Sequence, residues 1–370
     1  MTDDNTRRSR RRQFLKGTGA LVAGGSAGLA GCSGDDGAGG ETTTGTPTEG
    51  PATTGGTPTS PTGETPVAKV AASHYPLPTC TLAALMAKEK KLYEDNGITI
   101  SKVTSFSGGG TTIRGIVTGG ISAGLGASLT AVVKAYLAGA PIYLCGLTCQ
   151  SNDIEFHVRP DSDVESIQDL KGQKIAITNP GSITESLAIR SITNADGITL
   201  DDVELLYAGG LGEALTALNE GEAAASWNLP PKSVLTVQND QTRLLFKARK
   251  YAPHITQGTI PIGGRVLEEQ PDLAAGLMRT FIDAHEYVAE NPKETARVWA
   301  EANGVPEDVA VTVMTESVDL KAHLGVELTE EVLTSTADTL VTQGVLDEQP
   351  PWKEIIRQGP LPEDKRVDWV

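Results

Sequence analysis

The sequence predicts an α/β protein made of two similar lobes, each built on a parallel β-sheet. The first observation is a repeat. The segment "NGITISKVTSFSGG" at 96–109 resembles "DGITLDDVELLYAGG" at 196–210. The second is the shared order of a turn, a β-branched strand, a Gly-Gly loop and a helix. A helix is the usual connection between parallel neighbours. The repeat therefore indicates two lobes, by duplication or by convergence, although any two β-α units share some likeness.

The first predicted lobe opens with a strand at 67–73, which runs into a loop at 74–78 that contains two prolines. An amphipathic helix is expected at 81–97, where a glycine ends it. The stretch 128–141 predicts a helix that stops at a glycine and a proline. The apolar run "IYLCGL" predicts the strand that follows.

The second predicted lobe follows the same plan. Residues 153–190 predict a strand, an acidic turn, an Asp-Leu-Lys-Gly turn, another strand and a helix that begins after Gly-Ser. The second copy of the repeat comes next. From 271 to about 344 the apolar spacing is helical, so we expect a helical C-terminal part.

The first 32 residues carry targeting signals, which are separate from the fold. Arg11 and Arg12 belong to the twin-arginine pattern "RRRQFLK", and "LAGC" at 29–32 resembles a lipobox in which Cys32 receives a lipid. The apolar run 14–30 is too short and too rich in glycine for a membrane span. We expect twin-arginine export and a lipid anchor on the outer face of the cytoplasmic membrane.

Residues 33–66 are predicted to form a disordered tether. They contain no Val, Leu, Ile or aromatic residue. Such a segment cannot bury enough apolar area to offset the entropy of ordering. The folded part should therefore begin at residue 67.

The charge of the chain excludes one class of partner. The net charge is −16, and removal of residues 1–32, with six basic and two acidic residues, brings the mature chain to about −20. A nucleic acid is therefore not an expected partner. The acidic excess resembles that of halophile proteins, and a mesophile of low isoelectric point is the alternative.

Three cysteines lie in the predicted folded part. Cys145 and Cys149 would stand about 13 Å apart in an extended strand, too far for a disulfide. The odd number leaves one thiol over in any pairing, so buried free thiols are expected for Cys80, Cys145 and Cys149. No C-x-x-C spacing is present, and no metal site is predicted.

An ordered set of features resembles the solute-binding lipoproteins of ABC importers, of the nitrate, sulfonate and taurine type, in a haloarchaeal form. The features are the first strand with its Pro-x-Pro loop, "KEKKLYEDNGI", the Ser-Gly-Gly turn, "DLKGQKIAI" and "LNEGEAAASWNLPP". They span about 67–350. The resemblance implies a bilobed periplasmic-binding-protein-like fold of type II, in which two hinge strands join lobes that close on a small ligand.

The resemblance also implies the domain boundaries and the partners. Residues 67–153 and 252–370 would form lobe 1, and 154–251 would form lobe 2. The hinge strands would be "DIEFHVR" and "YAPHITQGT". The partners would be a small-molecule solute, the permease subunits with their cytoplasmic ATPase, and the membrane through the lipid on Cys32. We expect a monomer without a cofactor.

The candidate ligand site follows from the strand ends. In parallel α/β sheets, ligands gather at the carboxyl ends of strands, where helices begin and unpaired N–H groups carry partial positive charge. The predicted ligand-binding residues are His74, Tyr75, Pro76, Ser107, Gly108, Gly109, Gly126, Ala127, Ser128, Pro180, Gly181, Ser182, Thr184, Gly209, Gly210, Trp227 and Asn228. Ser182 with Glu185 also fits a capping box, and Tyr75 and Trp227 also fit a core.

These loops favour a small anion or zwitterion, because they offer hydroxyls and helix starts but no Arg, Lys, Asp or Glu. A neutral ligand such as a thiamine-precursor pyrimidine or another small aromatic molecule is the alternative. An enzyme is not expected, since the five histidines are scattered and no Gly-x-Ser-x-Gly occurs. Pyrimidine synthases share this fold, but their cysteine-rich motif is absent. An anchored sensor domain remains a third possibility.

Overall fold

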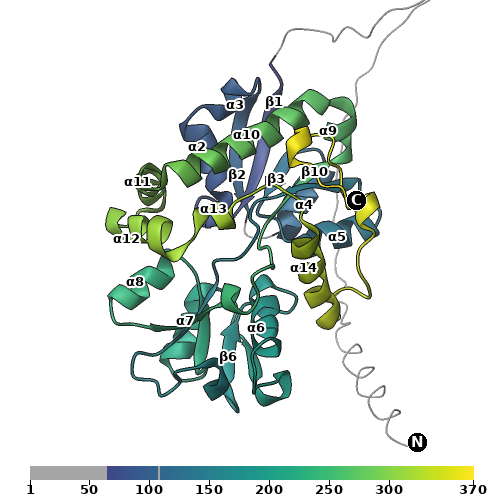
Figure 1. Ribbon diagram of the computed structural model, residues 1–370. Helices are drawn as coiled ribbons and strands as arrows, with labels where there is room; N and C mark the ends of the chain where they lie inside the picture. The colour runs from purple at the N-terminus through teal and green to yellow at the C-terminus, as the bar shows by residue number, and fades with distance from the viewer. Residues whose placement is uncertain (1–64, 107–108) are drawn as a thin grey trace, which may run out of the picture. The chain divides into compact units, whose positions relative to one another are not determined.

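The structure, a computed structural model, describes residues 65–106 and 109–370 (Figure 1). The predicted export signal with Arg11, Arg12 and Cys32, nearly all of the tether, and Ser107 and Gly108 lie outside the described residues. Among the described residues, no helix is long and apolar enough to cross a membrane.

The first sheet has five strands in the order β2-β1-β3-β10-β4. Strand β1 pairs in parallel with β2 and β3, whereas β10 runs antiparallel to β3 and β4. Strand β1 lies inside the sheet, and it is buried at Ala68 and from Val70 onward, where its residues are small or apolar. The strands are β1 (Val67–Ser73), β2 (Thr99–Phe106), β3 (Ala123–Leu125), β4 (Ile142–Leu147) and β10 (Thr259–Gly263).

Helices cover this sheet and continue into the C-terminal part. The predicted helix at 81–97 is a short 3₁₀ turn followed by two helices, because Lys91 takes a left-handed φ of 60° between them. The elements are η1 (Thr79–Thr81), α2 (Leu82–Glu89), α3 (Leu92–Asp95), α4 (Gly109–Val117), α5 (Leu129–Leu137), α9 (Gly264–Glu269), α10 (Pro271–Glu290), α11 (Pro292–Asn303), α12 (Glu307–Thr312), the π-helix η5 (Val313–Ser317), α13 (Leu320–His323), α14 (Glu330–Thr342), α15 (Trp352–Ile355) and η6 (Glu363–Lys365).

The second sheet also has five strands, in the order β7-β6-β8-β5-β9. Strand β6 is parallel to β7 and β8, and β5 is antiparallel to β8 and β9. The strands are β5 (Glu155–Val158), β6 (Lys174–Ile177), β7 (Glu204–Tyr207), β8 (Ala225–Asn228) and β9 (Arg243–Lys247). The helices are η2 (Ile167–Leu170), α6 (Ile183–Thr193), η3 (Leu200–Asp202), α7 (Leu211–Asn219), α8 (Lys232–Gln238) and η4 (Ala248–Lys250).

The two copies of the repeat occupy equivalent places in the two sheets. The first copy forms β2-α4-β3, and the second forms β7-α7-β8. In each sheet the first strand of the copy is an edge strand, and one further strand separates it from the second. Gly119 and Gly221 follow the two helices with φ near 75° and 77°, which ends each helix in the same way. The predicted α/β fold with two sheet-based lobes is confirmed.

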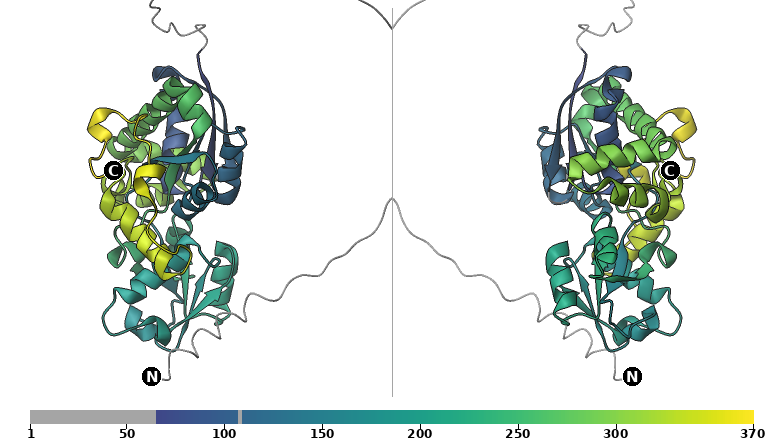
Figure 2. Two further views of the ribbon diagram at one scale, coloured as in Figure 1. Left: turned by 90° about the vertical axis from the view of Figure 1, so that its right-hand side faces the viewer. Right: turned by 90° about the vertical axis from the view of Figure 1, so that its left-hand side faces the viewer.

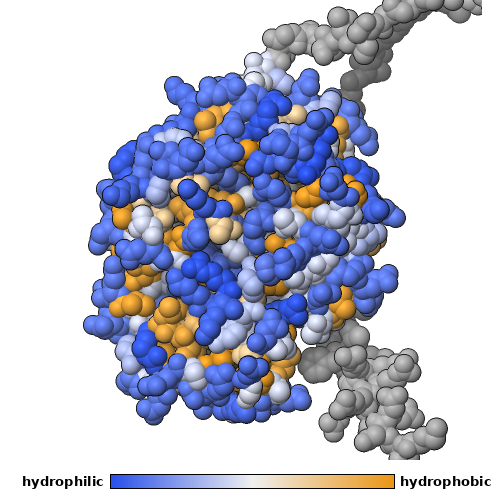
Figure 3. All heavy atoms as spheres, viewed as in Figure 1, coloured by the Kyte–Doolittle hydropathy of each residue, from blue (hydrophilic) through white to orange (hydrophobic). Residues whose placement is uncertain are grey.

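Each sheet has its own apolar core. Residues such as Leu125, Leu144 and Phe281 belong to the core of the first, and Phe156 stacks on Phe246 in the core of the second. Figure 2 shows helices on both sides of the two sheets. On the face drawn in Figure 3 the surface is mostly hydrophilic, with apolar residues in small scattered groups.

Two segments connect the sheets, and the predicted hinge strand "DIEFHVR" forms β5 over Glu155–Val158 just after the first of them. The first runs from 148 to 154, where β4 has ended and β5 has not begun. The second runs from 248 to 258 through η4 and turns, so that only Thr259 of the predicted strand "YAPHITQGT" lies in a strand. Side chains hold these segments together instead, for example Gln257 Nε2, which donates to Asp153 Oδ1 over 2.7 Å.

Candidate functional site

The carboxyl edge of the parallel strands in the first sheet lies at the two connections. Strand β10 enters the sheet at Thr259, which pairs with Leu147 at the end of β4. Thr259 also bridges to Ala127, just beyond β3. The loops after β3 and β4 and the start of β10 therefore share one edge.

The second sheet is oriented in the same way. Glu155 at the start of β5 pairs with Asn228 at the end of β8 and with Lys247 at the end of β9. Since the first connection leads directly into Glu155, the carboxyl edge of β6, β7 and β8 also lies at the connections. The loops predicted to bind a ligand thus belong to two sheet edges that meet at the same short connections.

The loop after β1 is held in an uncommon conformation. His74 has a φ of 54°, and its N–H donates to the Phe106 carbonyl over 2.8 Å. Tyr75 is half-buried, and this burial raises the pKa of its phenol. Trp299 Nε1 donates to the Pro76 carbonyl over 3.1 Å and fixes the outer end of the loop. A rigid loop of this kind is suited to presenting backbone and side chains to a ligand.

Gly126 is a position where the chain needs glycine. Its φ is 69°, and an added Cβ would come within 3.1 Å of Thr81 and 3.6 Å of Ser73. Ala127 is buried, and its carbonyl accepts from Thr259 Oγ1 over 2.8 Å. Ser128 caps α5 by accepting from the Ala131 N–H over 3.3 Å.

Ser73 is a candidate site residue that the sequence prediction missed. It is the last residue of β1, next to Gly126, and its Oγ is buried with no hydrogen-bond partner among the described residues. Buried hydroxyls are nearly always paired, so an unpaired one at a sheet edge indicates a place for a ligand or water. The sequence signal was weak, since a serine at a strand end is ordinary.

The loop after β6 is organised around the start of α6. Ser182 accepts from the Glu185 N–H over 3.2 Å, and Glu185 Oε2 accepts from the Gly181 N–H over 2.5 Å. The capping role foreseen for Ser182 is therefore real, although the Glu185 carboxylate binds the Gly181 amide instead of that of Ser182. Thr184 is buried, and its Oγ1 accepts from the Thr178 N–H over 3.0 Å. Pro180 precedes the left-handed Gly181 in the same loop.

The loop after β7 ends in two glycines with different surroundings. Gly209 has a φ of 96°, its N–H donates to the Thr178 carbonyl over 3.1 Å, and the space around its Cα is open. Gly210 precedes α7, and an added Cβ there would lie 2.6 Å from the Glu213 carboxylate. The open space at Gly209 is compatible with close approach of a ligand to the backbone.

The two residues predicted after β8 are less available. Asn228 is fully buried, its Nδ2 donates to Thr236 Oγ1 over 3.1 Å, and its Oδ1 accepts from the Leu229 N–H over 2.9 Å. Trp227 packs in the core of the second lobe, and its Nε1 has no partner among the described residues. A free indole N–H near the sheet edge is a second unused donor. Ser107 and Gly108 lie outside the described residues, and Gly109 begins α4.

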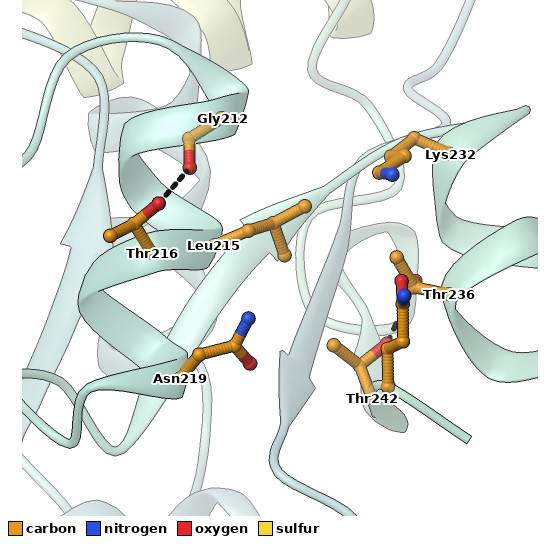
Figure 4. A pocket seen from close by; sticks show the side chains of 8 residues that line it. Gly212, Leu215, Thr216, Asn219, Lys232, Thr236 and Thr242 are labelled. Atoms are coloured by element: carbon orange, nitrogen blue, oxygen red, sulfur yellow. Dashed lines mark hydrogen bonds between the residues drawn. The ribbon is translucent and has the colours of Figure 1, made fainter. Parts of the chain in front are cut away.

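Among the hollows of the described chain, the one of about 600 Å³ beside the loop after β7 is lined by Tyr207, Ala208 and Gly212. One of about 310 Å³ lies between α7 and α8, with Asn219 and Lys232 on opposite walls (Figure 4). Another of about 430 Å³ lies beside α10 and α13 and is lined by His285. Among the described residues, no group of three or more His, Cys, Asp or Glu is arranged to hold a metal ion. Cys80, Cys145 and Cys149 are buried free thiols, as the sequence predicts.

Comparison with protein families and structures gives a consistent result. The family model described as NMT1/THI5 like matches residues 80–295. No curated protein sequence matches the chain. Structural similarity is broader, since it extends over about four fifths of the chain in each of the structures described next.

Three solved structures represent this similarity. The periplasmic aliphatic sulphonate binding protein SsuA from Escherichia coli is 18% identical, with a TM-score of 0.67, over 82% of this chain and 96% of that one. SsuA from Xanthomonas axonopodis pv. citri bound to MOPS is 19% identical, with a TM-score of 0.64, over 83% of this chain and 100% of that one. The periplasmic nitrate-binding protein NrtA from Synechocystis PCC 6803 is 16% identical, with a TM-score of 0.63, over 80% of this chain and 87% of that one. These likenesses confirm the predicted periplasmic-binding-protein-like fold.

Proposed function

Because the chain belongs to the NMT1/THI5-like family, we propose that it is the extracytoplasmic solute-binding component of an ABC importer. In this role it captures a small anionic or zwitterionic solute between its two lobes and delivers it to a permease. The proteins of similar fold include sulfonate- and nitrate-binding proteins, which supports a solute of this class.

The observation that carries the proposal is the meeting of two strand edges at the connections, with unused donors on both. The hydroxyl of Ser73 on the first sheet and the indole N–H of Trp227 on the second have no partner among the described residues. Helices α5 and α6 also begin at these edges, and helix N-termini favour negative charge. Oxygen acceptors of a sulfonate or nitrate group match such donors without a full countercharge.

The lobes proposed for this function are those expected from the sequence. Lobe 1 comprises 67–153 and 252–370, and lobe 2 comprises 154–251. The separate cores of the two sheets and the short connections support this division. Movement at the connections would change the distance between Ser73 and Gly209, which belong to different sheets, and would so open and close the site.

The proposed location follows from the N-terminal signals. Arg11 and Arg12 direct twin-arginine export, Cys32 carries a lipid, and residues 33–66 tether a monomeric domain to the outer face of the membrane. The tether gives the domain freedom to meet the permease, whose ATPase lies in the cytoplasm. A flexible chain of this length reaches roughly 30 Å.

Thermal unfolding of the full chain in high salt, with and without MOPS, taurine, ethanesulfonate, nitrate or hydroxymethylpyrimidine, tests the proposal. A solute at one hundred times its Kd should stabilise the fold by about 2.7 kcal/mol. We expect a shift with a sulfonate or nitrate. A shift with the pyrimidine alone would support the alternative of a pyrimidine-binding protein, and catalytic turnover of any solute would contradict the proposal.

A matched pair of serine variants locates the site. Ser73→Ala should weaken binding of the active solute about fivefold or more, because it removes a hydrogen bond worth about 1 kcal/mol. Ser191→Ala is the control, since Ser191 Oγ is also buried and unpaired but lies within α6. Equal affinities for Ser73→Ala and the unmodified chain in calorimetric titration would place the site elsewhere.

A further inference from the structure

Two of the three buried thiols lie together where the first connection leaves the first sheet. Cys80 is in η1, immediately after the loop at 74–78, and Cys149 lies two residues beyond the end of β4. Both side chains are buried, and the proximity of Cys149 raises the pKa of the Cys80 thiol. The sequence could not pair them, because 68 residues separate them.

The same segment of the second connection borders both sulfurs. Cys80 Sγ lies 3.6 Å from the position that a Cβ on Gly258 would take. Cys149 Sγ lies 3.7 Å from Thr256 Oγ1. An added Cβ at Gly258 would also come within 2.9 Å of the Gly126 backbone, so the chain segments around the two thiols are closely packed. The thiols therefore lie at the point where both connections and the loop after β3 meet.

Cys145 is in a different environment, although it is only four residues before Cys149. It lies within β4, and its sulfur is 3.9 Å from the Tyr143 carbonyl. Burial raises the pKa of its thiol to about 12.

We propose that Cys80 and Cys149 are a redox-active pair that forms a reversible disulfide and so ties η1 to the first connection. The oxidant is a low-molecular-weight or protein disulfide. The Cys149 thiolate attacks it to give a mixed disulfide and one released thiol. The Cys80 sulfur then attacks the mixed disulfide, giving the Cys80–Cys149 bond and a second released thiol. Two protein thiols are oxidised, and one disulfide is reduced to two thiols.

The two pKa shifts agree with this division of roles. Burial alone would raise the pKa of the Cys149 thiol, but the hydrogen bond from Cys80 and the charge of His323 lower it below its ordinary value. The pKa of Cys80 is raised by the hydrogen bond to Cys149 and by burial. Cys149 is thus the readier thiolate, and Cys80 is the resolving thiol.

The disulfide would add a covalent bond to a junction that side-chain hydrogen bonds already hold together. Thr79, next to Cys80, donates to the Asp153 carboxylate and lies 3.1 Å from His323 Nε2. Asp153 is in the first connection. A bond from Cys80 to Cys149 would therefore restrict the connection that must move if the lobes open, and it would also fix the loop that carries His74.

Non-reducing peptide mapping tests the proposal. The full chain with Cys32→Ala is exposed to bis(2-hydroxyethyl) disulfide, both as native protein and during refolding from the reduced, unfolded state. We expect a mass lower by 2 Da and a tryptic species that joins the peptide of Cys80 to the peptide that carries both Cys145 and Cys149. Refolding gives the reagent access to both thiols even if the native fold excludes it.

Single variants assign the bond. The linked species should persist in Cys145→Ser and disappear in Cys80→Ser and Cys149→Ser, with circular dichroism to confirm folding of each. A linked species that persists in Cys149→Ser, or free thiols and mixed disulfides alone after refolding, would overturn the proposal.

Discussion

Gln343, the residue that follows α14 at its C-terminal end, donates a hydrogen bond from Nε2 to Oε2 of Glu185 in α6 over 3.1 Å, and so links helices that pack on different sheets. Ser186 Oγ donates to Gln343 Oε1 over 3.1 Å and completes a two-sided contact. Glu185 is buried and also accepts from the Tyr207 hydroxyl over 2.6 Å. This contact joins the lobes through side chains, in addition to the covalent connections, and can resist separation of the lobes.

Gln343→Ala should make the open arrangement of the lobes more favourable. The variant loses two hydrogen bonds, one of them to a carboxylate, so we expect a cost of about 1 to 2 kcal/mol to the closed arrangement. The radius of gyration of the unliganded chain, measured by small-angle X-ray scattering, should increase, and affinity for the solute should fall several-fold.

Gln349→Ala is the control for that change. Gln349 Nε2 donates to Asp338 Oδ1 over 2.7 Å, within the C-terminal part. Gln349→Ala should leave the radius of gyration and the affinity for the solute unaltered. If the two variants behave alike, the contact between Gln343 and Glu185 has no part in closure.

The fold could be predicted because its signals are local. Glycines at 97 and 197, and again at 119 and 221, mark the same turns in both copies of the repeat, and all four have positive φ. Alternation of strand and helix then fixes a parallel sheet. The link between Gln343 and Glu185 has no such signal, because the two residues lie 158 positions apart and only the packing of the C-terminal helices brings them together.

The sequence could predict which loops form the candidate site, but not which side chains in them are free to bind a ligand. The rule that ligands bind at carboxyl ends of strands selects the loops around Gly126 and Ser182. It cannot tell which side chains are already engaged. Thr184 and Asn228 have their polar groups bonded within the protein, whereas Ser73, which the sequence prediction omitted, does not. That difference depends on buried contacts with residues distant in the chain.

Gly209 and Gly212 offer a test of backbone strain at the predicted site. Both have open space around Cα, but only Gly209 has a positive φ, at 96°. Gly209→Ala should destabilise the fold by about 1 to 2 kcal/mol, because a Cβ is disfavoured in that conformation. Gly212→Ala, within α7, should stabilise it by up to about 1 kcal/mol. Urea unfolding measures both, and equal effects would contradict the strain argument.

Anchoring is tested in the cell that makes the protein. Cys32→Ala should shift the protein from the membrane fraction to the medium or leave it unprocessed, because no other lipid acceptor is predicted. Replacement of Arg11 and Arg12 by lysine should block export. Unchanged processing and membrane association of Cys32→Ala would refute the lipid anchor, and undiminished export of the double variant would indicate the general secretory route.

His285 should make stability depend on pH. Its ring is buried in α10, and neither nitrogen has a partner among the described residues. Burial lowers the pKa of this imidazole to about 4, while the charge of Glu327 acts in the opposite direction. In the unfolded chain a histidine titrates near 6.5, so the unfolded state takes up the proton first as the pH falls. The stability contribution is therefore complete above about pH 6.5 and is lost as the pH falls toward 4.

The measurable window is pH 7.5 to pH 5. As the pH falls over this range, proton uptake by His285 in the unfolded state should lower the free energy of unfolding by about 2 kcal/mol. His285→Leu should remove that part of the slope, and His254→Gln is the control, since the His254 side chain is about half exposed and lies 3.1 Å from the Glu331 carboxylate. Glu155, whose pKa is lowered by its hydrogen bond to His157 against the effect of burial, loses its contribution mainly below pH 4.5 and does not interfere. Urea unfolding at both pH values decides the matter, because an unchanged slope in His285→Leu would mean that another group takes up the proton.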